Sequence, residues 1–180
     1  ISKVRIVMEQ LGTKQLEYLR IQKPIDLQGN VAGLAIVNAF SDATPIFSIR
    51  GVSADDIYPT SSSPVGVYYD DVYAASPLML VQPVFDLQRV EVLKGPQGTL
   101  YGRNTPGGAI NFISQRPTDT TSGYFNLGFG RWDTLQGEGA IGGAITPDIL
   151  FRISGTYTRA GEGYQKDIDT GRKFGKPDRG

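Results

Sequence analysis

Two short alternating segments joined by a glycine-rich connection constrain the fold more than any other feature of this 180-residue chain. Residues 89–94 and 109–114 each alternate apolar with polar side chains over much of their length, which is typical of half-buried β-strands. The residues between them include five glycines and two prolines. This composition suits tight chain reversals, because glycine reaches positive φ without steric cost. The segment therefore predicts two strands joined by a rigid, turn-rich connection.

A glycine-rich loop after a strand can also cradle a phosphate by aiming backbone amides at the anion. The connection contains neither Gly-Lys-Ser/Thr nor Gly-x-Gly-x-x-Gly, the spacings on which nucleotide-binding loops depend. The motif therefore does not favour nucleotide binding. A structural hairpin remains the simpler interpretation of these residues.

The composition of the whole chain excludes several classes of function. Eighteen basic residues balance eighteen acidic ones, so no overall field favours a nucleic-acid partner. The chain has no Cys and no His, which removes disulfides, thiolate metal sites and the commonest general base. Residues 167–171 superficially resemble a calcium loop but lack its later ligands and terminal Glu. We expect no cofactor and no metal site.

Apolar residues never form an uninterrupted run long enough for a membrane-spanning helix, which needs about 18 of them. The 23 glycines and the 10% aromatic content favour turns and sheets over a helical bundle. A short helix is expected over residues 14–20, with Thr13 as its cap and Leu16 and Leu19 on its apolar side. Residues 65–72 predict a single strand.

The glycine-rich segment resembles the plug-domain signature of TonB-dependent outer-membrane receptors. The resemblance rests on Val-Glu-Val-Leu-Lys-Gly-Pro-Gln-Gly at residues 90–98, Tyr-Gly-Arg at 101–103 and Gly-Gly-Ala-Ile-Asn at 107–111. Upstream, residues 47–51 resemble the Ile-Arg-Gly element of that family. Residues 67–72 resemble its Asp-Gly-Val segment, with Asp71 in place of Gly. The resemblance implies an α+β plug domain over residues 1–118, built as a small mixed sheet with short helices.

Residues 119–180 have a different pattern, in which long segments are apolar on one side and polar on the other. Phe125, Leu127 and Phe129 share a side, as do Ile149, Phe151, Ile153 and Tyr157 farther along. Three such segments of about ten residues are typical of transmembrane β-barrel strands, although a soluble meander with one wet face has the same pattern. In the resembled family this region starts a 22-stranded antiparallel barrel. We therefore expect the barrel to continue beyond Gly180, and a secretion signal and TonB-contacting peptide to precede Ile1.

The resemblance implies TonB-dependent active transport of a bulky, scarce nutrient across the outer membrane of a Gram-negative bacterium, with the plug gating the barrel lumen. Ferric siderophores are the most frequent substrates of the family, and cobalamin, haem and oligosaccharides are alternatives. The implied partners are TonB, the nutrient and outer-membrane lipid, and no enzymatic reaction is implied. The residues alone also allow a soluble or surface-exposed binding or adhesion module without a transport role.

Four residues are candidate site residues. By resemblance, Arg50 and Lys94 match cations that pair with barrel-wall carboxylates, and solvated surface cations are the alternative. Tyr58 and Met79 are candidate substrate contacts in the apical plug loops, and both could equally be packing residues. The adjacent carboxylates Asp70 and Asp71 are poor candidates for an acid–base pair, because neighbours on a strand point to opposite sides.

Overall fold

The computed structural model describes residues 7–38, 45–54, 63–102, 104–130, 133–159, 165–166 and 173–174. The chain divides into two compact units, Ile1–Gln115 and Arg116–Gly180, and each is described by itself. The elements of the first unit are, in chain order, β1 (Val7–Gly12), α1 (Thr13–Leu19), η1 (Pro24–Leu27), β2 (Leu34–Asn38), β3 (Pro45–Ile49), β4 (Val65–Tyr69), β5 (Val72–Tyr73), η2 (Pro77–Val81), β6 (Leu87–Lys94), α2 (Gly98–Tyr101) and β7 (Gly108–Ser114).

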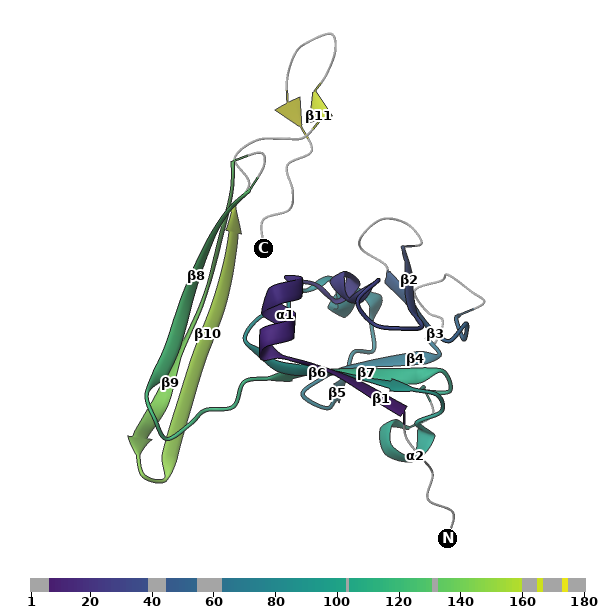
Figure 1. Ribbon diagram of the computed structural model, residues 1–180, viewed down its shortest axis with the longest axis horizontal. Helices are drawn as coiled ribbons and strands as arrows, with labels where there is room; N and C mark the ends of the chain where they lie inside the picture. Colours follow the sequence, from purple (N-terminus) through teal and green to yellow (C-terminus); the bar gives the residue numbers. More distant parts are fainter. Residues whose placement is uncertain are drawn as a thin grey trace. The chain divides into compact units, whose positions relative to one another are not determined.

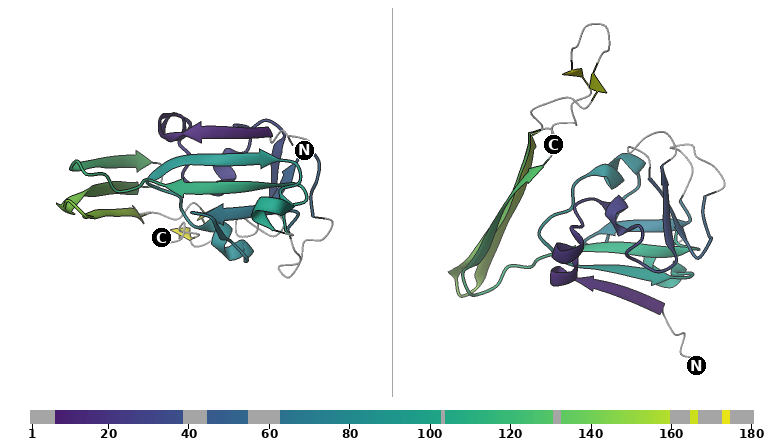
Figure 2. Two further views of the ribbon diagram at one scale, coloured as in Figure 1. Left: turned by 90° about the horizontal axis from the view of Figure 1, so that it is seen from below. Right: turned by 45° about the horizontal axis from the view of Figure 1, so that its top comes forward.

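A five-stranded mixed sheet organises the first unit, in the order β1-β6-β7-β4-β5. Strands β4 and β7 run parallel, and the other neighbouring pairs are antiparallel. Figure 1 shows α1 and the separate β2–β3 hairpin on one side of this sheet and α2 on the other, and Figure 2 shows its strands side by side. The predicted α+β class with a small mixed sheet and short helices is confirmed.

The predicted pair of strands around the glycine-rich connection is confirmed as the antiparallel hairpin β6–β7. Val90 pairs with Phe112 and Val92 with Ile110, and all four side chains are buried in the main core. The connection closes on itself through backbone bonds from Gly95 to Gly107 and from Gln97 to Thr105. Alternation alone therefore placed the core side of this hairpin correctly.

Helix α1 forms where the sequence predicts it, but Thr13 is not its cap. Gly12 is the N-cap residue, and its N–H donates to the side chain of Gln15. The Thr13 hydroxyl instead donates to the backbone carbonyl of Gln88 at 2.8 Å, which ties the start of the helix to β6. Leu16 is buried in the main core, and Leu19 packs against it. The Gln88 carbonyl on β6 therefore accepts the hydrogen bond of the Thr13 hydroxyl, which the local sequence alone would assign to capping the helix.

The single strand predicted over residues 65–72 is wrong, because the chain turns at Asp70 and Asp71. Tyr69 on β4 pairs with Val72 on β5, so the two aspartates form a two-residue hairpin turn. Their φ angles are 48° and 67°, as a type I′ turn requires. Asp is among the few non-glycine residues found in this region. The two carboxylates therefore lie at a turn and not along a strand.

The second unit contains the antiparallel sheet β10-β9-β8, built from β8 (Ser122–Gly130), β9 (Thr134–Thr146) and β10 (Ile149–Arg159). A two-stranded pair, β11 (Gln165–Lys166) and β12 (Lys173–Phe174), follows. Register places Phe125 opposite Gly139 and Ile141 opposite Ile153, so the predicted apolar residues share one face, and most of them are exposed. Residues 167–171, which superficially resemble a calcium loop, lie outside the described residues. Among the described helices, none is long and apolar enough to cross a membrane.

Candidate functional site

A row of polar and aromatic side chains crosses the face of the five-stranded sheet opposite the main core. Glu91 on β6 lies beside Asn111 on β7, Asn111 beside Tyr68 on β4, and Tyr68 beside Tyr73 on β5. Successive side chains of a strand point to opposite faces. The apolar neighbours of Tyr68, Glu91 and Asn111 along β4, β6 and β7 therefore pack on the core side, while this row forms what we call the polar sheet face.

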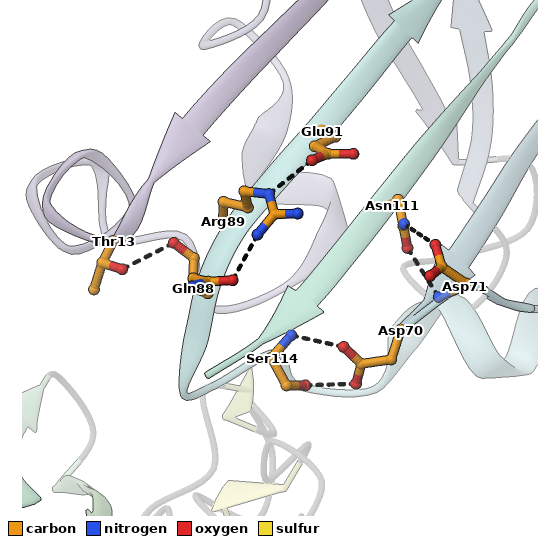
Figure 3. Close-up of polar contacts among 8 residues, drawn as sticks. All are labelled: Thr13, Asp70, Asp71, Gln88, Arg89, Glu91, Asn111 and Ser114. Atoms are coloured by element: carbon orange, nitrogen blue, oxygen red, sulfur yellow. Dashed lines mark hydrogen bonds and ion pairs between the residues drawn. The ribbon is translucent and has the colours of Figure 1, made fainter. Parts of the chain in front are cut away.

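Asn111 joins the polar sheet face to the β4–β5 turn. Its Nδ2 donates to Oδ1 of Asp71 at 2.6 Å, and its Oδ1 accepts from the backbone N–H of Asp71 at 3.3 Å. The neighbouring Asp70 accepts from both the backbone N–H and the hydroxyl of Ser114, each at 2.8 Å. Figure 3 shows both aspartates reaching β7 from the turn. Each carboxylate is therefore a structural acceptor that clamps the turn to the neighbouring strand.

Three tyrosines anchor the short helix α2 on this face. The rings of Tyr68 and Tyr101 lie 4.7 Å apart, and those of Tyr68 and Tyr73 lie 5.5 Å apart. The Tyr68 hydroxyl donates to the carbonyl of Tyr101 at 2.6 Å. Burial raises the pKa of Tyr68, and it also raises the pKa of Tyr101, to which the Glu91 carboxylate adds. Both phenols therefore stay neutral donors at physiological pH.

The glycine-rich connection folds back over Gly66 on β4. A Cβ at Gly66 would lie 2.6 Å from Cγ2 of Thr105 and 2.7 Å from the Tyr68 ring. Thr105 is fully buried, and its hydroxyl donates to the carbonyl of Gly102 at 2.8 Å. The connection, residues 95–107, is therefore packed against the sheet, and we call it the covering loop. Its glycines allow the close approach to the sheet and the tight turns.

Two ionisable side chains of the polar sheet face, Arg89 and Glu91, form an ion pair with each other. Arg89 Nε lies 2.7 Å from Oε1 of Glu91, and its Nη1 donates to the side chain of Gln88 (Figure 3). Within the described part of the chain, no group of three or more His, Cys, Asp or Glu residues could hold a metal ion. The arrangement fixes strands and a covering loop in place.

A family model described as "TonB-dependent Receptor Plug Domain" matches residues 2–109, more than half of the chain. The chain belongs to this family. Its plug contains the five-stranded sheet, the covering loop and the polar sheet face. The family consists of outer-membrane receptors and not of enzymes, which confirms the predicted localisation and the absence of an enzymatic role.

Known receptors resemble this plug closely in sequence and structure. The pesticin receptor of Yersinia pestis is 38% identical over 120 residues, covering 66% of this chain and 17% of that receptor. The ferripyoverdine receptor of Pseudomonas aeruginosa is 36% identical over 100 residues, covering 56% of this chain and 11% of that receptor. The chain thus spans about a sixth, or less, of the length of these relatives.

The crystal structure of the ferric yersiniabactin uptake receptor FyuA from Yersinia pestis superposes with a TM-score of 0.80 at 29% sequence identity. The match covers 94% of this chain and 26% of that chain. It extends over most of both units, so the likeness includes β8, β9 and β10 as well as the plug. The expected start of an antiparallel barrel after the plug is thereby confirmed as part of the fold.

The two predicted ionic contacts differ in their surroundings. Arg50 is exposed at the tip of a two-residue turn, with φ of 52°, where its backbone N–H donates to the carbonyl of Gly33. It makes no ion pair with any residue that the structure describes. Lys94, in contrast, lies 2.5 Å from Oε2 of Glu9 on β1. A barrel-wall partner for either residue stays a prediction.

The two predicted substrate contacts are only partly visible. Met79 on η2 is exposed, and its carbonyl accepts a hydrogen bond from the Tyr69 hydroxyl at 3.1 Å. Its backbone is thereby held while its side chain stays accessible. Tyr58 lies outside the described residues. Neither assignment is tested by these observations.

Sequence reasoning missed the partners that organise the plug, which are Glu9, Asn111 and the aspartate turn. The turn had a usable signal, since Asp-Asp between two aromatic, β-branched segments suits a type I′ hairpin. The sequence signal for Glu9 was weaker, because it consists only of a lone acid beside apolar Val7 and Met8 in a strand-like segment. Nothing local identifies Asn111 as a buried partner of residue 71, because 40 residues separate them.

Proposed function

We propose that the complete protein is a TonB-dependent receptor that carries a ferric siderophore across the outer membrane. The observation that supports this most is the likeness of 94% of the chain to the ferric yersiniabactin uptake receptor at a TM-score of 0.80. Relatives named ferripyoverdine receptor and ferrioxamine receptor support the same substrate class. If the substrate is not a ferric siderophore, the alternatives are cobalamin, haem and oligosaccharides.

In this proposal residues 1–118 form the plug inside the lumen, and residues 119–180 begin the barrel. A TonB-contacting peptide before Ile1 transmits force from the inner membrane, so the receptor itself needs no reactive group. The clamps from Asp70 and Asp71 to β7 keep β4 and β5 attached to the hairpin β6–β7 while the lumen is closed. Opening a path for a bulky solute then requires some other part of the plug to move.

A soluble binding or adhesion module is the competing function, and the second unit disfavours it. Phe125, Phe129 and Ile153 are each at least two thirds exposed on β8 and β10, and they lie on one face with Leu127 and Ile141. A contiguous apolar face of this kind is unusual on a protein surface in water. It suits contact with lipid, as in barrel strands that alternate apolar-out and polar-in.

Uptake measurements test the proposed transport directly. Cells expressing the complete receptor should accumulate iron from a panel of radiolabelled ferric siderophores only when TonB is present. Cells that carry an empty vector are the control. Uptake that does not depend on TonB would remove the active-transport function. TonB-dependent uptake of another nutrient, with none of any siderophore, would correct the substrate class alone.

Arg50 is proposed to pair with a carboxylate of the barrel wall, because it is a cation at an exposed turn with no ion-pair partner among the described residues. Replacing Arg50 by Ala should raise passive leakage of large solutes through the complete receptor. Arg20→Ala is a matched control, since Arg20 is also exposed and also has a positive φ, of 53°. Equal leakage in the two variants would contradict the proposed role of Arg50.

Met79 and Tyr58 are proposed to contact the substrate from the apical plug loops. Truncating an interface residue that contributes strongly to binding costs more than about 1 kcal/mol. If Met79 is such a contact, Met79→Ala should weaken siderophore binding at least about fivefold. Val72→Ala is a suitable control, since Val72 is also apolar and exposed but lies on β5. Binding that is unchanged in both Met79→Ala and Tyr58→Ala would remove this assignment.

A further inference from the structure

Glu9 is a carboxylate on the core-facing side of the edge strand β1. Glu9 pairs with Val92 and Leu11 with Val90, and both valines are completely buried. Side chains of paired residues point to the same face of a sheet. Glu9 therefore points toward the apolar side of the sheet, where an unpaired carboxylate would be costly.

Lys94 supplies the partner that Glu9 needs. Its ammonium lies 2.5 Å from Oε2 of Glu9, and the side chains are 9% and 33% exposed respectively. Lys94 pairs with Val7 in the β1–β6 ladder, so the ion pair joins diagonal neighbours on the core-facing side. Another ion pair joins Arg89 to Glu91 on the opposite face. The nearly buried ammonium of Lys94 thus depends on a carboxylate carried by a different strand.

The N-terminal half of β1 has few other attachments. Strand β1 is an edge of the five-stranded sheet and pairs only with β6. Leu11 is its one buried side chain, whereas Val7 and Met8 are about half exposed. Apart from the backbone ladder, the Glu9–Lys94 ion pair is the side-chain interaction that the structure gives to residues 7–10.

We propose that the Glu9–Lys94 ion pair is a latch that holds the N-terminal half of β1 on the sheet of the plug. This inference rests on the proposed function, since a pull from before Ile1 reaches β1 before any other described element. Release of β1 removes the carboxylate that pairs with the nearly buried Lys94 ammonium, and such a charge is costly until it finds another partner. Lys94 can then pair with the barrel-wall carboxylate that the sequence motif predicts. In this proposal Lys94 pairs with Glu9 while β1 is on the sheet and with the barrel wall after β1 is released.

Hydrogen exchange in the complete, detergent-solubilised receptor tests the latch without any transport step. Glu9→Gln keeps the size of the side chain but removes its charge. We expect the amides of residues 7–11 to exchange about 5- to 30-fold faster, the effect of losing an interaction that is a sizeable part of local stability. The amides of β7, at residues 109–113, should keep their rates, because the latch does not involve them.

Two further variants decide whether the pair itself is responsible. The charge swap Glu9→Lys with Lys94→Glu should return the exchange of residues 7–11 to within about threefold of the wild type, since it restores opposite charges. Glu17→Gln, which neutralises an exposed carboxylate on the adjacent helix α1, should leave these amides unchanged. Unchanged exchange in Glu9→Gln, or faster exchange that the swap does not reverse, would overturn the latch.

The outcome is separable from that of the proposed function. If uptake proves independent of TonB while the exchange results are as expected, the transport proposal fails and the latch remains a property of the plug. If uptake depends on TonB and the exchange of residues 7–11 is insensitive to Glu9→Gln, the latch fails and the receptor function stands.

Discussion

Asn111 and Asp71 hold each other through two hydrogen bonds across 40 residues of sequence. The Asn111 amide donates to the carboxylate at 2.6 Å and accepts from the Asp71 backbone N–H at 3.3 Å. Asn111 is 1% exposed, so water cannot easily replace either partner. The left-handed backbone of Asp71, with φ of 67°, is therefore maintained by a specific contact with β7.

Substitutions at Asp71 should separate backbone strain from the lost hydrogen bond. Asp71→Ala keeps the unfavourable φ and removes the carboxylate that accepts from Nδ2 of the buried Asn111, and a buried donor left without its acceptor costs about 1–3 kcal/mol. Asp71→Asn retains an acceptor and tolerates positive φ, so it should be nearly neutral. Asp71→Gly loses the bond but relieves about 1 kcal/mol of strain, so it should fall between them. The hydrogen-exchange rates of the β7 amides in the complete receptor measure this order. Equal rates in Asp71→Ala and Asp71→Asn would contradict it.

The parts of the fold that alternation controls were predictable from the sequence. Val90 and Val92 on β6 and Ile110 on β7 face the core as their spacing predicts. The apolar side of β8 likewise follows from Phe125, Leu127 and Phe129. Burial of one face fixes such patterns, because a shift of one residue would turn every side chain to the wrong side.

The parts that depend on distant partners were not predictable. The Thr13 hydroxyl binds β6 in place of its own helix, and Lys94 finds Glu9, 85 residues away. In both cases the local pattern allows several partners, and the sheet order β1-β6-β7-β4-β5 decides among them. The family resemblance predicted a barrel-wall contact for Lys94 but did not identify Glu9 as its neighbour, since the motif around residues 90–98 contains no information on β1.

The close approach at Gly66 should make that position intolerant of a larger residue. Gly66→Ala places a methyl group 2.6 Å from Cγ2 of Thr105, and overpacking of this kind costs about 1–3 kcal/mol. Thr105→Ser removes that methyl but keeps the hydroxyl that binds Gly102, so it should partly rescue Gly66→Ala. Gly98→Ala is the control, because a Cβ there meets nothing within 4 Å. The measurement is the thermal unfolding of the complete receptor, monitored by hydrogen exchange of the β4 amides.

If Gly66→Ala is as well tolerated as Gly98→Ala, the covering loop is not packed against β4 as described. A loss of stability that Thr105→Ser leaves wholly unrelieved would assign the clash to the Tyr68 ring, which lies 2.7 Å from the same Cβ position.

Tyr69 should make the plug sensitive to alkaline pH. Burial raises the pKa of Tyr69 to about 12, and its ring stacks on Phe112 at 5.2 Å. The folded state therefore keeps a proton that the unfolded state loses near pH 10, so this stability is present below pH 10 and is lost between pH 10 and about 12. In Tyr69→Phe the decline over that window should be shallower, whereas the exposed Tyr18→Phe should leave it unchanged. Denaturation midpoints measured from pH 8 to 12 would contradict this if the Tyr69→Phe curve parallels the wild type.

The two faces of β8 should respond differently to a charge if this strand lies in a barrel wall. Leu127 belongs to the exposed apolar face, and its neighbour Asn126 belongs to the other one. An Arg on the lipid-facing side of a barrel costs about 2–4 kcal/mol near the bilayer midplane, and lumen-facing substitutions cost less. Leu127→Arg should therefore lower the fraction of receptor that folds into lipid vesicles, as measured by heat-modifiable gel mobility, while Asn126→Arg should fold normally. Equal folding of the two variants would mean that the apolar face of β8 does not contact lipid, and the opposite order would reverse the assignment of lumen and lipid sides.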